Sequence, residues 1–415
     1  MKIKLLLIVL AFQFGFAQER NCGVVQKKIE LENNPTMHSK YEKNKALSEI
    51  ELNRLVNNQA NGITQRAGEI HIPVAVHYTG ANSATPAQKD CLRALAQNQV
   101  DILNADFNGT NSDISIWNNT TKTYFPGVNN GSLNVIFEIA TQNHPAGMGL
   151  VNGDKAITFG IRFGGGPDGD WDPDWAGYLN LVVENLSGST LGYAYLGSSP
   201  ADGAAVYIDA GAFGSGAGCT GYVPGAPYNL GRTLTHELGH YLNLEHIWGD
   251  ANCGNDFVAD TPLHNASNFG CPATGHLSTC AGTPRELTMN YMDYTNDVCM
   301  YMLTAGQAQR AQAHLNVIQP AFNLNTLSRN DYAFEKSISL FPNPSKGSFT
   351  IQFPEVIGNY SVQVLDQSAR LVYTNEFTNS SNLSQTVNLN SAATGVYFVK
   401  IKADNSIAIK KIVIE

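Results

Sequence analysis

The sequence carries little charge, and its acidic residues outnumber its basic ones. Charged residues make up 15% of the 415 residues, and 35 acidic against 26 basic residues give a formal net charge of −9. Nucleic acid and anionic membranes both require a basic face, so neither is expected as a partner. No internal repeat and no low-complexity tract is visible. With 43% hydrophobic residues, the length fits one large domain and one or two small ones.

Long apolar runs are absent after the first residues. The chain begins MKIKLLLIVLAFQFGFA, in which two lysines precede an apolar stretch and small residues follow at Gly15 and Ala17. This pattern predicts a secretory signal peptide over residues 1–17, because the apolar stretch is too short to span a bilayer. Cys22 follows no small apolar residues, so a lipoprotein anchor is not expected. The protein is predicted to leave the cytoplasm without a transmembrane anchor.

Export affects how the cysteines are interpreted, because disulfides persist outside the cell. The chain has seven cysteines, and four of them lie between residues 253 and 299. This clustering suggests a loop-rich region held by local disulfides. Four cysteines allow three connectivities, and spacing alone does not choose among them.

Composition along the chain divides it into segments. Residues 18–65 are polar, with helix-like stretches and no obvious core, and are interpreted as a propeptide. Residues 66–322 combine strand-like runs such as IHIPVAVHY with a helical run around AQKDCLRALAQNQVDILNADF, which predicts a mixed α/β domain. A linker follows at 323–336. Alternating strands separated by Pro, Gly and Asp-Asn turns predict a small all-β sandwich over residues 337–415.

Two histidines four residues apart stand in the segment HELGHYLNLEH, which begins at His236. On a helix such residues lie about 40° from each other, so His236 and His240 project from one face and can share a metal ion. Glu237 is then placed to reach metal-bound water rather than the metal. His246 lies roughly 120° further round an unbroken helix. It can join as a third ligand only if the helix ends before it and the chain turns back.

Asn243 stands where such a turn is needed. A residue in the left-handed conformation redirects the chain after a helix, and glycine is the usual choice. Asparagine tolerates this conformation next best, so the sequence predicts the turn at Asn243 and a site with three histidines. A second signal follows in NYMDYTNDVCM, where Met292 precedes Tyr294 by two residues.

These segments resemble the pappalysin family of metzincin zinc proteases, and in particular its ulilysin-like members. The resemblance rests on GRTLTHELGHYLNLEHIWGD, DFVADTP, FGCP and NYMDYTNDVCM and extends over roughly residues 66–322. It implies a metzincin-like fold, with a twisted mixed sheet, a zinc helix and a loop-rich C-terminal subdomain. It also implies three zinc ligands, His236, His240 and His246, with a fourth position open for water.

The resemblance further implies the catalytic roles. Glu237 would act as general base and then as general acid in peptide-bond hydrolysis, and Tyr294 would stabilise the oxyanion near zinc. Met292 corresponds to the Met-turn beneath the zinc site. The segment STLGYAYLG at 189–197 corresponds to the edge strand that binds an extended peptide. The chain is therefore predicted to be a secreted zinc endopeptidase that acts on proteins or peptides.

Two alternatives remain open. A gluzincin-type protease would take a distant glutamate such as Glu286 as its third ligand, although His246 already fills the extended motif. A secreted adhesin or binding protein would use zinc structurally, but a structural site normally has four protein ligands. Zinc content measured together with peptidase activity separates these classes.

The resemblance implies the disulfides Cys253–Cys280 and Cys271–Cys299. Parity adds Cys91–Cys219 once Cys22 is set aside. Cys22 lies in RNCG within the propeptide, which resembles a cysteine switch in which a thiolate occupies the open position of zinc. An incidental free thiol is the alternative. The resemblance thus implies that the protein is made as a latent zymogen.

Asp297 lies three residues beyond Tyr294, at a position that belongs to the S1′ pocket in ulilysin-like enzymes. A partly buried carboxylate favours a cationic side chain, and bidentate pairing favours Arg over Lys. Cleavage is therefore predicted on the N-terminal side of Arg, and less readily of Lys. A solvated loop charge is the alternative interpretation of Asp297. The same rule marks the Gln65–Arg66 bond as the activation site.

Structural calcium in the catalytic domain is also implied by the resemblance. Its oxygen ligands are expected among Asp250, Asp256 and Asp260. The acidic segment GPDGDWDPDW at 166–175 is a further candidate, although a solvated loop is the simpler interpretation.

The C-terminal segment has a resemblance of its own. FPNPSKG, LVYTNEF and the ending GVYFVKIKADNSIAIKKIVIE resemble the sorting domain of the type IX secretion system, over about residues 337–415. This implies a Gram-negative protein that crosses the outer membrane, with the secretion machinery as a partner, and is released or attached to the surface. A carbohydrate-binding or adhesive sandwich is the alternative, and it would need an exposed aromatic platform.

Overall fold

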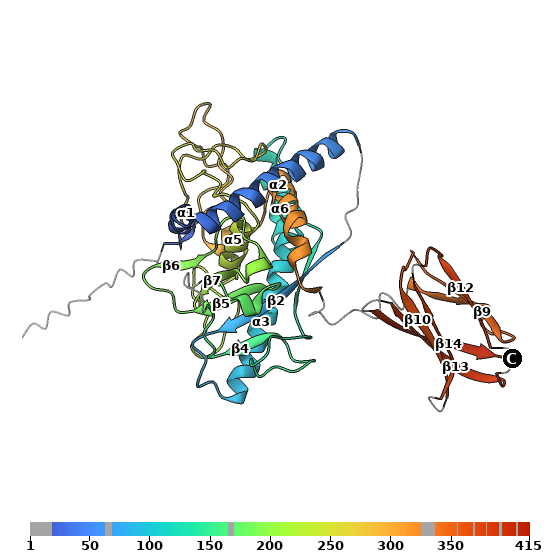
Figure 1. The fold of residues 1–415 in the computed structure, drawn as a ribbon. Helices are drawn as coiled ribbons and strands as arrows, with labels where there is room; N and C mark the ends of the chain where they lie inside the picture. The colour runs from blue at the N-terminus through green and yellow to red at the C-terminus, as the bar shows by residue number, and fades with distance from the viewer. Residues whose placement is uncertain are drawn as a thin grey trace, which may run out of the picture. The chain divides into compact units, whose positions relative to one another are not determined.

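The chain forms two compact units, Met1–Leu327 and Ser328–Glu415, each with its own hydrophobic core (Figure 1). The computed structural model describes residues 19–62, 69–164 and 170–324 of the first unit. In the second it describes residues 337–415 without 355, 368–369, 379, 390–391 and 404–405. The expected signal peptide, the Gln65–Arg66 bond and most of the expected linker lie outside the described residues.

The first unit is built on a seven-stranded sheet of order β1-β6-β7-β5-β2-β3, with β4 also paired to β2. Its strands are β1 (Asn21–Cys22), β2 (Ile70–Tyr78), β3 (Val135–Ile139), β4 (Ile157–Phe159), β5 (Leu179–Glu184), β6 (Thr190–Tyr193) and β7 (Ala205–Asp209). Strands β2 to β5 and β7 are parallel, and β6 is antiparallel to β7. The interior strand β2 is buried along almost its whole length, as expected where both faces of the sheet are covered. The predicted mixed α/β fold is confirmed.

Four of the described helices lie between or after strands β2 to β7 in the chain. They are α3 (Pro86–Phe107), α4 (Ile114–Asn119), α5 (Arg232–Tyr241) and α6 (Ala305–Ile318), with short 3₁₀ turns at Thr121–Tyr124, Pro173–Trp175, Pro200–Asp202, Asp297–Cys299 and Gln319–Ala321. A capping box between Thr85 and Gln88 begins α3. Helix α5 contacts α3, β6 and β7, and all of its residues are buried. Among the described helices, none is long and apolar enough to cross a membrane.

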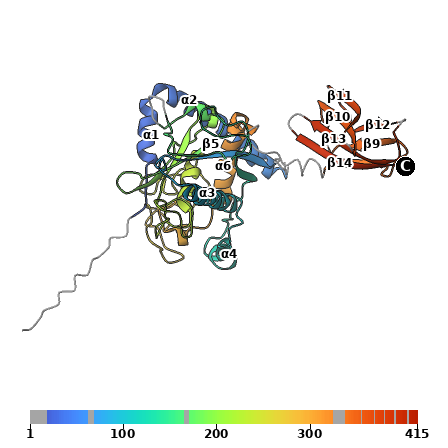
Figure 2. The ribbon, with the colours of Figure 1, turned by 90° about the horizontal axis from the view of Figure 1, so that it is seen from below.

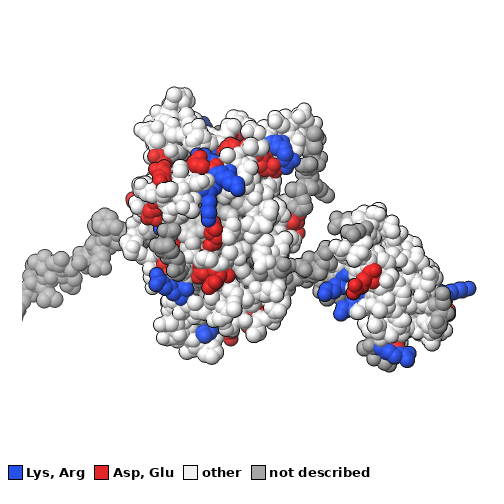
Figure 3. Space-filling view, in the orientation of Figure 1, with Lys and Arg blue, Asp and Glu red and all other residues white. Residues whose placement is uncertain are grey.

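The N-terminal segment, residues 19–62, packs against the rest of the first unit. It contains β1, α1 (Val24–Asn33) and α2 (Pro35–Ala60), and Asn34 separates the helices by capping α2 through Met37 N. Strand β1 pairs in parallel with β6, and α2 lies along α6 (Figures 1 and 2). Figure 3 shows basic and acidic side chains close together over the region of α1 and β6, rather than a patch of one sign. Because residues 19–62 pack against β6 and α6, this segment needs no hydrophobic core of its own.

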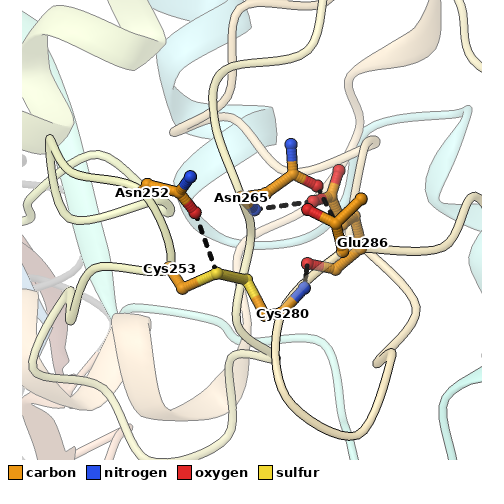
Figure 4. Close-up of a disulfide and its surroundings, with 7 residues drawn as sticks. Asn252, Cys253, Asn265, Cys280 and Glu286 are labelled. Carbon is orange, nitrogen blue, oxygen red and sulfur yellow. Dashed lines mark hydrogen bonds between the residues drawn. A yellow bond between two sulfur atoms is a disulfide. The ribbon is translucent and has the colours of Figure 1, made fainter.

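Three disulfides hold the loops of the first unit. Cys91–Cys219 ties the start of α3 to the loop after β7. The other two, Cys253–Cys280 and Cys271–Cys299, lie in the long loop region between α5 and α6, and the first is drawn in Figure 4. These are the pairs that resemblance and parity implied. Cys22 is free and buried.

The second unit is a sandwich of two antiparallel sheets, as the alternating pattern predicted. Their orders are β11-β10-β13-β14 and β12-β9-β8. The strands are β8 (Ser339–Phe341), β9 (Ser348–Gln352), β10 (Tyr360–Asp366), β11 (Leu371–Phe377), β12 (Ser384–Asn388), β13 (Gly395–Ala403) and β14 (Ser406–Ile414). On β13, Tyr397, Val399 and Ile401 are buried, whereas Phe398 and Lys402 are exposed and Lys400 is partly exposed. The period of two therefore separates core from surface.

Candidate metal centre

Three histidine side chains converge at the C-terminal end of α5. His236 and His240 lie on the helix, and His246 lies in the turn beyond it. The Nε2 atom of His240 is 3.2 Å from the Nε2 atoms of both His236 and His246. All three side chains are fully buried.

The second ring nitrogen of each histidine fixes the orientation of the ring. The Nδ1 atoms of His236 and His240 lie 2.6 and 2.7 Å from the carbonyl oxygens of Tyr291 and Leu244, and that of His246 contacts the Asp250 carboxylate. Such acceptors keep the proton on Nδ1, so three Nε2 lone pairs face one another. Burial also lowers the pKa of each imidazole, which keeps the rings neutral. Neutral donors that converge in this way fit a cation such as zinc.

The turn that brings His246 back depends on Asn243. Helix α5 ends at Tyr241, and Asn243 has a φ of 68°, which confirms the predicted left-handed residue. The amide of Leu244 then donates to the Gly239 carbonyl at 2.9 Å. The chain reverses within a few residues of the helix end.

The loop at 290–294 lies directly beneath α5. A Cβ added to Gly239 would lie 2.4 Å from Met292 Sδ, so the helix and the buried Met292 are in close contact. The Tyr294 ring centroid is 5.0 Å from that of His246 and 5.7 Å from that of His236. Burial raises the pKa of Tyr294 well above its ordinary value, so its hydroxyl stays protonated.

Glu237 and Cys22 meet beside the histidines. The Cys22 thiol donates to Glu237 Oε2 at 3.1 Å, and the ligand atoms of Cys22 and the three histidines all lie within 4.8 Å of one another. Burial raises the pKa of Glu237 to about 8. On β6, a Cβ at Gly192 would approach Glu237 Cγ to 2.7 Å, so only glycine leaves room for this carboxylate.

Asp297, the residue expected in the S1′ pocket, is buried and forms an ion pair with the buried Arg20. Arg20 Nη2 is 2.6 Å from Asp297 Oδ1, and the guanidinium carbon is 4.9 Å from the Tyr228 ring centroid. Asp297 Oδ2 accepts instead from the amides of Leu230 and Arg232. Arg20 therefore pairs with Asp297 through one carboxylate oxygen, and the bidentate pairing expected for a substrate arginine stays a prediction. A planar cation over an aromatic ring still favours arginine.

Arg20 was not predicted from the sequence as a residue of this site. It pairs with a carboxylate 277 residues away, and basic residues in a polar segment usually indicate a solvated surface. One signal was available. Arg20 lies two residues before Cys22, the predicted switch residue, and Asp297 was already predicted to place a carboxylate in the S1′ pocket.

The other predicted ligands lie in separate surroundings. Asp250 contacts His246 and Lys28, Asp256 accepts from Thr261, and Asp260 accepts from Thr304. Glu286 accepts from the Asn265 amide, beside the disulfide in Figure 4. Within the described residues, Cys22 and the three histidines are the one group of such side chains with metal-binding geometry. The acidic segment 166–175 is only partly described.

Each of the two units is similar to a known protein family. Residues 170–316 match the peptidase family described as pregnancy-associated plasma protein-A, and residues 339–415 match the secretion system C-terminal sorting domain. An extracellular metalloprotease of Arthroderma otae is 31% identical over 47% of this chain and 78% of its own length. One from Arthroderma benhamiae is 38% identical over 32% of this chain, which spans only 48% of that relative.

Two solved structures are also similar. Mirolysin in complex with a compound is 32% identical, with a TM-score of 0.50, and the match covers 63% of this chain and 100% of that chain. A promirolysin mutant of Tannerella forsythia is 27% identical, with a TM-score of 0.53, and the match covers 72% of this chain and 95% of that chain.

Proposed function

The chain belongs to the pappalysin family of metalloproteases, peptidase family M43, and from this premise we propose that it is a secreted zinc endopeptidase made as a latent zymogen. It cleaves peptide bonds on the N-terminal side of arginine, and less readily of lysine. The observation that carries this proposal is the simultaneous placement of Cys22 at the histidine group and of Arg20 against Asp297.

The chemistry follows from the groups around the histidines. His236, His240 and His246 would hold zinc, which when bound acts as a Lewis acid and lowers the pKa of a water. Glu237 takes the proton of the attacking water and delivers it to the leaving amine. The protonated Tyr294 hydroxyl donates to the carbonyl oxygen as charge develops there. An extended substrate pairs with β6 through main-chain hydrogen bonds, as β1 does in the zymogen.

Latency follows from the place of Cys22. Its sulfur occupies the space between Glu237 and the histidines, where the attacking water must sit. Thiolate is a good zinc ligand, so this residue competes with water directly. The buried Arg20 fills the pocket that the substrate arginine needs.

The direction of the N-terminal segment also favours latency. A substrate arginine in the Asp297 pocket follows the scissile bond, whereas Arg20 precedes Cys22 along the chain. The segment therefore runs through the site in the opposite direction to a substrate. The parallel pairing of β1 with β6 is consistent with this reversal.

The matched relatives support the same division of the chain. The match to the promirolysin mutant covers 72% of this chain and the match to mirolysin covers 63%, as expected if a propeptide adds to the first. We assign residues 18–65 as the propeptide, after a signal peptide at 1–17, and residues 66–322 as the catalytic domain. The sorting domain directs secretion by the type IX system, whose machinery is its partner.

Cleavage of a peptide library by the activated protein, with mass spectrometry of the new termini, tests the specificity. New N-termini should begin with arginine, and less often with lysine. Asp297→Ala should lose this preference and mature slowly. If the wild-type enzyme shows no preference for arginine or lysine after the scissile bond, both the pocket assignment and self-cleavage at Gln65–Arg66 are contradicted.

Glu237→Ala tests the catalytic assignment. The variant should keep its zinc and lose activity by roughly 10²–10⁴-fold or more, because the ligands remain and the base is gone. Zinc content by elemental analysis and cleavage of an arginine peptide give the two readings. A wild-type protein that holds zinc but cleaves nothing would favour the structural-zinc alternative.

A further inference from the structure

A second basic side chain of the N-terminal segment is also seated in a formed site. Lys27 lies in the first turn of α1, where its amide donates to the Gly23 carbonyl. Its Nζ atom is 2.5 Å from Asp170 Oδ2 and 2.8 Å from Glu30 Oε2. Although burial alone would lower it, these carboxylates raise the pKa of Lys27 above its ordinary value. The side chain is only 14% exposed.

Two tyrosines complete the surroundings of this ammonium group. Lys27 Nζ lies 4.5 Å from the Tyr193 ring centroid and 5.3 Å from that of Tyr195. The Tyr193 hydroxyl donates to Asp170 Oδ1 at 3.2 Å, and the Tyr195 hydroxyl is shared between Asp170 Oδ2 at 3.2 Å and Glu30 Oε2 at 3.1 Å. A carboxylate between two aromatic rings is a favourable site for a cation. We refer to Asp170, Tyr193 and Tyr195 as the cation cage.

The cation cage belongs to the catalytic domain and does not depend on the propeptide for its shape. Tyr193 stacks on Tyr207 of β7 with centroids 4.7 Å apart, and Tyr195 packs against Trp171. Glu30 is on the same helix as Lys27 and would leave with it. Asp170 would then stay behind with both tyrosine hydroxyls and without the Lys27 ammonium group.

The position of the cation cage along β6 shows which part of a substrate can reach it. Asn21 is opposite Thr190 and Cys22 is opposite Gly192, so Arg20 and its pocket lie toward the start of β6. Tyr193 and Tyr195 lie toward the other end. The cation cage and the Asp297 pocket are therefore on opposite sides of the histidine group.

We propose that the cation cage is a second specificity site, which binds a lysine side chain of the substrate on the N-terminal side of the scissile bond. This inference rests on the proposed function, because the substrate arginine in the Asp297 pocket identifies the C-terminal side of the scissile bond and hence places the cation cage on the N-terminal side. Lys27 occupies the cage in the zymogen as Arg20 occupies the Asp297 pocket. The propeptide thus blocks both basic sites and the metal centre.

The chemistry of the cation cage favours lysine over arginine. Each oxygen of Asp170 already accepts one tyrosine hydroxyl, Oδ1 from Tyr193 and Oδ2 from Tyr195, and Lys27 uses the remaining acceptor site of Oδ2. A point-like ammonium needs only one such site, whereas a planar guanidinium needs the remaining sites of both oxygens to lie in its own plane for two parallel hydrogen bonds. A cavity of about 350 Å³ shares Asp170 and Tyr193 with the cage, but Arg162 also lines it and disfavours a longer cation.

Peptides with a fixed arginine after the scissile bond provide the test. Each position before the bond carries lysine, acetyl-lysine or norleucine in turn, and kcat/KM is measured for the activated enzyme. At one position lysine should exceed norleucine roughly tenfold, with acetyl-lysine close to norleucine. Asp170→Asn should bring that ratio close to one. Asp174→Asn removes an exposed charge from the same segment and should keep the ratio.

Binding gives a reading that does not need catalysis. The same peptides, labelled and added to activated enzyme in which a chelator has stopped cleavage, should show the same lysine preference in fluorescence anisotropy. Equal values for lysine and norleucine at every position, or a ratio that survives Asp170→Asn, would overturn the cation cage. Failure to cleave before arginine would instead contradict the proposed function, and anisotropy would still decide the cage.

Discussion

Asn243 holds a backbone conformation that side chains with a Cβ usually avoid. Its φ of 68° places His246 against the other histidines. Asn243→Ala should lower the free energy of unfolding by about 1–2 kcal/mol, because asparagine tolerates this conformation better than alanine does. Asn243→Gly should be neutral or slightly stabilising. Urea unfolding of the zymogen measures both, and an alanine variant as stable as wild type would contradict the argument.

His314 is expected to make the full-length protein less stable in acid. It lies fully buried on α6 between Ser48 Oγ of α2 and the Ser198 carbonyl, and burial lowers its pKa to about 4. A histidine that is neutral when folded contributes stability above its unfolded pKa. That contribution is lost as the pH falls from about 6.5 toward 4.

The loss from His314 should reach about 2 kcal/mol at pH 5. Unfolding midpoints of wild type and His314→Gln at pH 7 and pH 5 measure it. The glutamine variant should lose less stability between these pH values, whatever its stability at pH 7. An equal loss in both proteins would exclude His314 as the source.

Individual site residues could be predicted from the sequence where they lie close together in the chain. The three histidines, Glu237 and the turn at Asn243 lie within one short segment, where helix geometry relates them. Arg20 and Lys27 were not predicted, because their partners are distant in sequence and become neighbours only through strand pairing. Arg20 contacts only one oxygen of Asp297, and the other accepts backbone amides, which lie far from Asp297 in the sequence.

Among the elements, β1 places the thiol that we propose as the zymogen switch. Cys22→Ala should give a zymogen that activates faster, because water can then reach Glu237 while the rest of the propeptide remains. The appearance of the mature form and of activity over time measures this, with Cys22→Ser as a polar control of similar size. Unchanged latency in both variants would indicate simple steric blockage.

The disulfide between α3 and the loop after β7 closes the longest loop of the three. Cys91 and Cys219 are 128 residues apart, so their bond restricts the unfolded chain strongly. Replacing both by alanine should lower the free energy of unfolding by about 2–5 kcal/mol. Denaturant unfolding checks this, and a change below about 1 kcal/mol would mean that other contacts already fix the loop.

Elements with a clear period were predictable from the sequence. The helical run at 87–107 lies within α3, and the apolar runs around Val135, Leu181 and Val206 are β3, β5 and β7. The position of α1 and α2 was not predictable. Their apolar faces are weak, and they pack through polar contacts such as Arg310 with Glu49.

At the scale of the whole molecule, two separate cores should unfold separately. The described core residues of the sandwich form a cluster distinct from that of the first unit. Calorimetry should therefore resolve two transitions. Deletion of residues 328–415 should remove one transition and leave the other at its temperature within error. A single cooperative transition would show that the units stabilise each other.

The parallel pairing of β1 with β6 has a practical consequence for inhibitor design. A compound that copies the order Arg-Asn-Cys-Gly offers its arginine to the Asp297 pocket and its sulfur to the histidines while its backbone runs against the direction of hydrolysis. The water that Glu237 deprotonates then has no correctly oriented amide to attack. Such a compound would block the enzyme without being consumed, whereas the same side chains in the reverse order would make a substrate.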